Sequence, residues 1–309
     1  AKTGRPKPQK LLPDGAMATA LLAACILVAA TAAGEPRKLR FKVNATEVQD
    51  SVVYAPGLFP LELRRQIAHY FADMPYDPYL ETVTRTRKFG KYLLRDLASE
   101  PPMRLEYKGN HFIQTGDYNE LVRQGKMALV RKYEEHDDGF FENPLVQAVL
   151  GFAARTFLSL GAKPGVPFEL GLHTVRLTAP GMVTPEGVHC DGYDFVLSTV
   201  IDREGIEGGA SLFYASKDQP PILEVPMEAG DAVVINDKAL FHAVEGIRPA
   251  PGHAKGHRDV ILLTGRPWPT DAQGNLIDDV ALHLSQLEGS REAPEQAAPS
   301  EERNAEGAA

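Results

Sequence analysis

Cysteine is scarce in this chain of 309 residues, which contains only Cys25 and Cys190. Two cysteines cannot build a disulfide framework, so nothing in the sequence demands an oxidising compartment. Excess positive charge is also missing, because 33 Lys and Arg residues stand against 41 Asp and Glu residues, giving a formal charge of −8. Nucleic-acid surfaces require clustered Lys and Arg, so this balance argues against a nucleic-acid partner.

Long hydrophobic runs are limited to residues 15–34, which carry no charge and are dominated by alanine. Basic residues between Lys2 and Lys10 precede this segment, which is the layout of a secretory signal or a single membrane anchor. Alanine is barely hydrophobic enough to insert into a membrane, and a true start at Met17 would remove the positive flank. A helix on the surface or in the core of the protein is an equally good interpretation of residues 15–34. We expect a cytoplasmic protein, with membrane association through residues 15–34 as the other interpretation.

The spacing of apolar residues along the chain changes near Phe168. Before it, apolar spacing predicts helices over residues 61–74, 118–135 and 143–161, the last with Asn143 as N-cap, Pro144 at its first position and Gly161 past its end. From Phe168 onward, short β-rich runs are separated by Gly, Pro, Asp and Asn. These runs cover residues 168–178, 195–202, 210–216, 222–225, 232–236, 240–246 and 258–264. A further short strand is predicted near residues 52–57.

Helices followed by strands predict an α+β fold. Short strands at turn-like intervals are typical of a double-stranded β-helix, a jelly-roll or cupin-like barrel, which the N-terminal helices would buttress. We expect an N-terminal extension over residues 1–50 and one domain over residues 51–285. A tail rich in Glu, Ala, Ser and Pro, residues 286–309, is predicted to be disordered.

The pattern His-x-Asp occurs three times, beginning at His136, His189 and His257. Side chains two apart on a strand point to the same face, so such a pair can hold one metal ion with a third ligand from another strand. The first copy lies in a charge run, and no strand-borne histidine follows the third. Only the middle copy is followed by a histidine on a distant predicted strand, His242. His189, Asp191 and His242 therefore form the candidate iron site, because two histidines and a carboxylate leave open positions on Fe(II).

Other interpretations of these residues stay open at this point. His242 could be a hydrogen-bonded core histidine, and Asp191-Gly192 is an ordinary turn dipeptide. Two histidines and one carboxylate also bind zinc in hydrolases.

A buried arginine would be needed if 2-oxoglutarate were the co-substrate, because its far carboxylate requires a permanent, planar cation. Arg258 opens an otherwise apolar predicted strand, and Thr264 shares its face, where the hydroxyl would support the same carboxylate. The competing candidates are Arg248 and Arg266. An arginine in contact with solvent at the barrel edge is the alternative for Arg258.

Several ordered blocks resemble the 2-oxoglutarate/Fe(II) dioxygenases related to bacterial isoleucine dioxygenase, over about residues 52–266. The blocks are residues 85–92, 114–119, 173–176, 185–194, 208–211, 230–242 and 258–260. The resemblance implies a double-stranded β-helix, the cofactors Fe(II), 2-oxoglutarate and O₂ with ascorbate as reductant, and hydroxylation of a small substrate, typically a free L-amino acid. It also implies that His189, Asp191 and His242 are the metal ligands, that Arg258 holds 2-oxoglutarate, and that Gly208-Gly209 forms a tight turn.

The substrate contacts are less defined. Arg176 or a residue of the basic-aromatic run 85–92 could pair with an amino-acid carboxylate, and Tyr118 or Tyr193 could line the pocket. Two alternative functions are a hydroxylase of protein or peptide side chains, and a metal-binding β-barrel without catalysis. The sequence shows no recognition domain for the first, and it retains all four site residues, which argues against the second.

Overall fold

The computed structural model describes residues 40–41, 51–80, 82–126, 130–278 and 280. The chain divides into two units, residues 1–268 and residues 269–309. Apart from Arg40–Phe41, the predicted extension and its segment 15–34 lie outside the described residues, as does the predicted tail. The boundaries at residues 50 and 285 therefore stay predictions. No helix in the described part of the chain is long and apolar enough to span a membrane.

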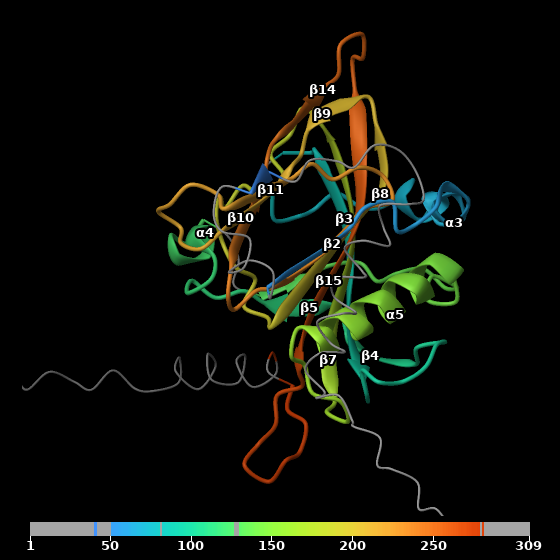
Figure 1. Ribbon diagram of the computed structural model, residues 1–309, viewed down its shortest axis with the longest axis vertical. Helices are drawn as coiled ribbons and strands as arrows, with labels where there is room; N and C mark the ends of the chain where they lie inside the picture. The colour runs from blue at the N-terminus through green and yellow to red at the C-terminus, as the bar shows by residue number, and fades with distance from the viewer. Residues whose placement is uncertain (1–39, 42–50, 81, 127–129, 279, 281–309) are drawn as a thin grey trace, which may run out of the picture. The chain divides into compact units, whose positions relative to one another are not determined.

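Two antiparallel sheets dominate residues 1–268 (Figure 1). The larger has the order β2 (Val52–Ala55), β12 (Ala232–Asn236), β8 (Phe195–Glu204), β15 (Gly256–Pro267), β7 (Phe168–Ala179), β3 (Arg85–Leu94) and β4 (Leu105–Gly109). The smaller has the order β1 (Arg40–Phe41), β11 (Leu223–Val225), β10 (Ser211–Tyr214) and β13 (Phe241–Val244). Two-stranded ribbons join β9 (Ile206–Gly208) to β14 (Ile247–Pro249), and β5 (His111–Ile113) to β6 (Val130–Lys132).

The two sheets pack against each other through alternate side chains. Val200 of β8 and Val233 of β12 form one buried cluster with Phe213 of β10 and Leu223 of β11. This face-to-face arrangement is compatible with the predicted jelly roll. Among the described strands, however, the ladders end at β2 and β4 in one sheet and at β1 and β13 in the other, so no closed barrel forms.

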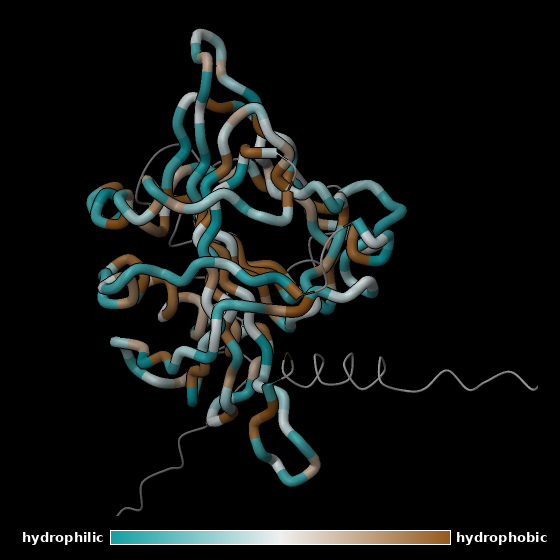
Figure 2. Tube along the Cα trace, turned by 180° about the vertical axis from the view of Figure 1, so that it is seen from behind, coloured by the Kyte–Doolittle hydropathy of each residue, from teal (hydrophilic) through white to brown (hydrophobic). Residues whose placement is uncertain are grey.

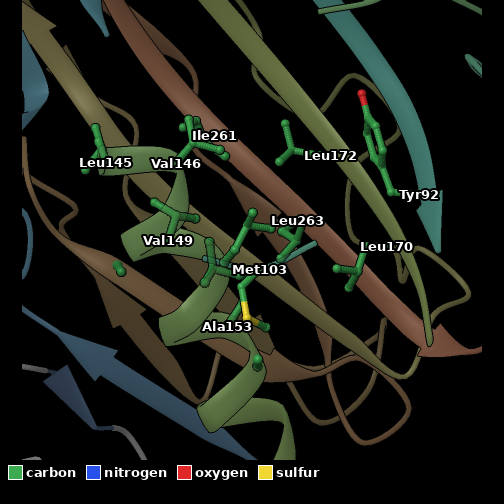
Figure 3. Close-up of a cluster of buried hydrophobic side chains, with 14 of the residues drawn as sticks. Tyr92, Met103, Leu145, Val146, Val149, Ala153, Leu170, Leu172, Ile261 and Leu263 are labelled. Atoms are coloured by element: carbon green, nitrogen blue, oxygen red, sulfur yellow. The ribbon is translucent and has the colours of Figure 1, made fainter. Parts of the chain in front are cut away.

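One long helix, α5 (Pro144–Ser159), covers the outer face of the larger sheet. Its ends are those predicted, because the Asn143 side chain accepts a hydrogen bond from the Leu145 amide at 2.9 Å and Gly161 has a φ of 107°. Figure 3 shows Val146 of the helix beside Ile261 of β15, within one buried cluster that also contains Val149. Hydrophobic residues concentrate along the packed strands, and hydrophilic residues along the surrounding loops (Figure 2).

A set of N-terminal buttressing helices is not supported, because only the helix predicted over residues 143–161 forms as one long helix. Residues 61–74 form only α3 (Leu61–Arg65) and a 3-10 turn, η2 (Ala68–Phe71), while residues 118–135 contain α4 (Glu120–Arg123) and strand β6. The first half of the chain instead contributes β3 and β4 to the larger sheet. Apolar spacing does not fix the length of a helix, as residues 61–74 show, and over short stretches it does not separate a helix from a strand, as β6 shows.

The predicted strands after Phe168 are all present, from β7 to β15. The short strands β9 and β14 were not foreseen, and neither was β3, whose basic residues disguise a buried strand. Arg85 illustrates the reason: it is 8% exposed because its charge is neutralised inside the protein by Asp77.

Candidate active site

Three predicted ligands converge where a loop after β7 meets β13. The Nε2 atom of His189 lies 3.6 Å from Asp191 Oδ1, and the Nε2 atom of His242 lies 3.5 Å from Asp191 Oδ2. One donor atom from each of these residues lies within 4.8 Å of the other two. Such a set can hold one divalent metal ion from one side and leave the other side open.

Backbone contacts fix the loop to the strand beside these ligands. His189 and His242 form an antiparallel bridge, with amide-to-carbonyl distances of 3.0 and 2.7 Å. The Asp237 carboxylate, which is 4% exposed as a residue, accepts hydrogen bonds from the amides of Asp191 and Gly192 at 2.8 and 3.0 Å. Asp237 thus ties the His-x-Asp loop to the turn that precedes β13.

Each histidine turns its second nitrogen to an oxygen outside the cluster. His189 Nδ1 donates to the carbonyl oxygen of Gly187 at 2.9 Å, and His242 Nδ1 lies 3.3 Å from Asp237 Oδ1. Metal-binding histidines are commonly oriented in this way, since the outer partner selects the tautomer that presents Nε2 to the metal. Both Nε2 atoms are therefore aimed at the Asp191 carboxylate.

The charges of the cluster depend on one another. Burial would raise the pKa of Asp191, but His189 and His242 outweigh it and hold the pKa well below its usual range. Burial would lower the pKa of His242, yet Asp191 and Asp237 outweigh it and raise the pKa to about 10. A metal ion bound at Nε2 must displace these protons, so metal and protons compete for the same atoms.

The three ligands line a pocket of about 1170 Å³, including its mouth, between the two sheets. Alternate residues of β15 form part of its wall: Arg258, Val260, Leu262 and Thr264. Arg258 pairs in register with Leu177 of β7 and Arg203 of β8. The strand thus carries one guanidinium group into the same cavity as the candidate metal ligands.

Arg258 is a buried cation without an acceptor among the described residues. It is 1% exposed, and its Nε and Nη2 atoms have no hydrogen-bond partner. Burial, aided by the nearby charge of Arg203, lowers the pKa of Arg258 to about 10. An unsatisfied buried guanidinium is costly unless an anion binds it. The Gly208-Gly209 turn beside it has the predicted positive φ angles of 81° and 77°, and Gly208 has no room for a Cβ next to the Gly246 carbonyl.

Thr264 does not belong beside Arg258. It shares the pocket face, as expected, but six residues of a strand span about 20 Å, so the two side chains cannot contact one carboxylate of 2-oxoglutarate. The Thr264 hydroxyl instead donates to the Gly171 carbonyl at 3.4 Å. Two side chains on the same face of a strand can lie far apart along it, and the prediction did not take that distance into account.

The competing arginines are both paired. Arg248 has a 69% exposed side chain and lies 2.8 Å from Glu207. Arg266 lies 3.0 Å from Glu169, a carboxylate that is almost fully buried. Neither offers the unsatisfied buried cation that Arg258 provides.

The other two His-x-Asp copies have different surroundings. His136 stacks on Phe140, and its Nδ1 is 3.4 Å from the Tyr92 hydroxyl. His257 does meet two carboxylates, but the Asp259 carboxylate is held at 2.7 Å by both Nε and Nη2 of Arg176. A carboxylate already engaged by a guanidinium is a poor metal ligand, so the middle copy remains the candidate.

Only some of the residues expected to contact the substrate line the pocket. The Arg176 expectation is wrong, because this residue pairs with Asp259 on the face of β15 opposite Arg258. Tyr118 is 40% exposed and its ring covers Gly192. Tyr193 does line the pocket, and so do Arg85 and Arg87 of the basic-aromatic run.

Sequence reasoning gave no role to several pocket residues. Glu186 lies just before His189, and its Oε1 atom is 3.5 Å from His189 Nε2. Arg131 reaches the cavity from β6, within a stretch that had been predicted to be helical. The acidic residue in the loop before His189 was a visible signal, whereas nothing local marked Arg131.

Comparisons with known proteins agree with this geometry. The family model described as 2OG-Fe dioxygenase matches residues 68–264. Among solved structures, the chain is similar to a bsmA homolog from Methylobium petroleophilum, with 20% identity, a TM-score of 0.58 and coverage of 75% of this chain and 97% of that chain. It is also similar to IDO from Bacillus thuringiensis, with 20% identity, a TM-score of 0.50 and coverage of 67% and 85%. At this identity the likeness shows the fold alone. A comparison with curated proteins found no match.

Proposed function

The chain belongs to the 2OG-Fe dioxygenase family, and from that membership we propose that it hydroxylates a small free L-amino acid. The family uses Fe(II), 2-oxoglutarate and O₂, so the protein is a 2-oxoglutarate-dependent oxygenase. In the proposal, His189, Asp191 and His242 hold Fe(II), and Arg258 holds 2-oxoglutarate. The free amino acid as substrate rests on the sequence resemblance to isoleucine dioxygenase and on the basic lining of the pocket.

The donor set supports the assignment of the metal ligands. Two imidazoles and one carboxylate suit Fe(II), and their donor atoms are already grouped within 4.8 Å. When bound, Fe(II) and 2-oxoglutarate together supply the oxidation by O₂, in which 2-oxoglutarate is converted to succinate and CO₂ and one oxygen atom enters the substrate.

One observation carries the proposal: the buried Arg258 guanidinium with two unsatisfied nitrogens lies in the same pocket as the three ligands. A carboxylate would satisfy Nε and Nη2 with a pair of charge-assisted hydrogen bonds. A zinc site with the same ligands does not by itself require such a cation. The far carboxylate of 2-oxoglutarate, with its 2-oxo acid on the metal, accounts for both features at once.

The remaining residues of the pocket position the reactants and keep water away. The walls near Arg258 are apolar, with Val260 and Leu262 on β15 and Val175 and Leu177 on β7. Such walls strengthen the electrostatic contacts inside the site. Asp237 keeps the His-x-Asp loop and His242 together through three short contacts, so the open face of the metal site points into the cavity.

The test is succinate formation by purified protein with Fe(II), ascorbate and 2-oxoglutarate against a pool of free amino acids. We expect succinate release that one or a few amino acids stimulate and that His189→Ala abolishes. Lys238→Ala is the matched control, because Lys238 is a surface residue paired with Asp194. A protein that binds zinc, shows no affinity for 2-oxoglutarate and forms no succinate would contradict the proposal.

A further inference from the structure

A third histidine, His173 of β7, lines the pocket besides the two candidate metal ligands. It is 5% exposed and lies in register with Leu262 of β15 and Phe89 of β3. Its ring contacts the rings of Phe89 and Phe112, at centroid distances of 4.4 and 5.6 Å. Aromatic side chains thus hold the imidazole in one orientation on the pocket face of the larger sheet.

Arg87 of β3 determines which nitrogen of His173 carries the proton. The Nε atom of Arg87 lies 3.2 Å from His173 Nδ1, and its Nη2 atom lies 2.7 Å from the same nitrogen. A guanidinium group has only N–H donors, so Nδ1 must accept through its lone pair and carries no hydrogen. The hydrogen of the neutral ring is therefore on Nε2.

The surroundings of His173 also keep the ring uncharged. Burial and the charge of Arg87 lower the pKa of His173 well below its usual range. Arg87 is in turn held by the Tyr133 ring, whose centroid is 4.8 Å from the guanidinium carbon, and by Asp77 at 4.0 Å. A second proton, on Nδ1, would point at this fixed guanidinium group, so the neutral Nε2–H form is the stable one.

The Nε2–H group has no acceptor within the described part of the chain, where the hydrogen bonds of the His173 side chain end on Nδ1. The described side-chain atoms that are both enclosed and without a partner include Nε and Nη2 of Arg258 but not Nε2 of His173. An unpartnered atom that is not enclosed is open to the adjacent space, which for this residue is the pocket. Polar groups of buried residues are normally hydrogen-bonded, so this N–H is prepared for an acceptor on a bound molecule.

This donor is separate from Arg258 on the pocket wall. Arg258 is in register with Leu177 of β7, and His173 lies four residues away on that strand, or about 13 Å along it. In the proposed function, the far carboxylate of 2-oxoglutarate is on Arg258 and its 2-oxo acid is on the metal. The acceptor for His173 then belongs to the other molecule in the pocket, which is the substrate.

We propose that His173 is a specificity-determining residue that donates a hydrogen bond from Nε2 to an oxygen atom of the substrate, and that Arg87 is a positioning residue that fixes the donating form of the ring. This inference rests on the proposed function and names a group that the substrate must carry. A fixed, uncharged N–H donor accepts a carbonyl, hydroxyl or carboxylate oxygen, and it rejects an N–H group at the same place because two donors leave each other unpaired.

The first experiment measures the position of the proton by ¹⁵N NMR of histidine-labelled protein, with Zn²⁺ in place of Fe(II) so that no turnover occurs. We expect His173, identified by the loss of its signals in His173→Gln, to be neutral with the proton on Nε2. Arg87→Met should allow the form with the proton on Nδ1 to appear as well. Arg248→Met is the matched control, because the Arg248 guanidinium is exposed and paired with Glu207. A proton on Nδ1 in the unmodified protein would overturn the inference.

The second experiment identifies the molecule that meets the Nε2–H group. The probes are 2-oxoglutarate alone, and 2-oxoglutarate with the amino acid that stimulates succinate formation most strongly. We expect the Nε2–H resonance to move only when the amino acid is added. His173→Leu should raise KM for the amino acid at least about tenfold with a smaller change in kcat, and His173→Gln, which keeps an N–H donor, should restore part of the loss. A resonance that moves equally with 2-oxoglutarate alone would assign the acceptor to the co-substrate and refute the proposal.

Failure of this inference can be distinguished from failure of the proposed function. If the unmodified protein forms succinate and His173→Leu has an unchanged KM, only the role of His173 is wrong. The same holds if 2-oxoglutarate is consumed but no amino acid moves the resonance. Absence of both 2-oxoglutarate binding and turnover in the unmodified protein would overturn the proposed function itself. Binding of 2-oxoglutarate in a thermal-shift assay also reports that each variant is folded.

Discussion

Replacement of Arg258 by methionine should have two opposite effects. Without 2-oxoglutarate, the variant should be more stable than the unmodified protein, because a fully buried cation with two unsatisfied nitrogens is exchanged for an apolar chain of similar length. Exchanges of buried charge for hydrophobic groups are neutral to stabilising, by about 1–4 kcal/mol. With 2-oxoglutarate, this advantage should disappear.

The loss of affinity follows from the same two nitrogens. Each charge-assisted hydrogen bond from Nε or Nη2 contributes about 1.5–3 kcal/mol, so both together correspond to a roughly 100- to 10,000-fold weaker Kd for 2-oxoglutarate. At a concentration 100 times the original Kd, the unmodified protein gains about 2.7 kcal/mol of stability from the ligand. The Arg258→Met variant should gain about 0.4 kcal/mol or less under the same conditions.

Chemical denaturation with and without 2-oxoglutarate, under anaerobic conditions with Fe(II), measures both effects. The same substitution at Arg266 serves as control. Arg266 is paired with the buried Glu169, so Arg266→Met should destabilise the protein by about 3–5 kcal/mol while leaving the 2-oxoglutarate effect intact. Undiminished 2-oxoglutarate binding by Arg258→Met would refute the assignment of the co-substrate carboxylate to this residue.

Three further predictions concern Asp237 behind the metal ligands, the ion pair of Asp77 with Arg85, and the hydrophobic core. Asp237→Asn should weaken Fe(II) binding about 10- to 100-fold, measured by competition titration, since the outer partner of His242 loses its negative charge; equal affinity would contradict that role. Arg85 and neighbouring groups hold the pKa of Asp77 below its ordinary value despite burial, so the carboxylate stabilises the fold above pH 4 or so and this contribution is lost as pH falls. Asp77→Asn should therefore lower the free energy of unfolding at pH 7, with the difference shrinking toward acidic pH; a pH-independent difference would argue against the pair. Phe157→Ala should cost about 3–5 kcal/mol in a denaturant titration, because the ring is fully buried between α5 and the sheet; a loss below 1 kcal/mol would show that the core closes over the gap.

Some features of the fold could be predicted from the sequence because each depends on residues that are close together in the chain. The limits of α5 follow from Asn143, Pro144 and Gly161, each of which acts on its own turn of helix. The strands after Phe168 follow from short apolar runs between turn residues. The same patterns failed to predict β3, because its charged residues do not look like those of a buried strand. Arg85 is buried there in an ion pair with Asp77.

The sequence by itself determined the types of group that the site contains: a histidine and an aspartate two residues apart, a distant histidine, and an arginine at the mouth of an apolar strand. Sequence context also selected the middle His-x-Asp copy, but only the structure shows the bridge that brings His189 to His242. The tertiary structure also separated Thr264 from Arg258 and gathered Arg87, Arg131 and Glu186 around one cavity. Strand register and sheet packing bring such residues together across long stretches of chain, and no pattern of neighbouring residues encodes those distances.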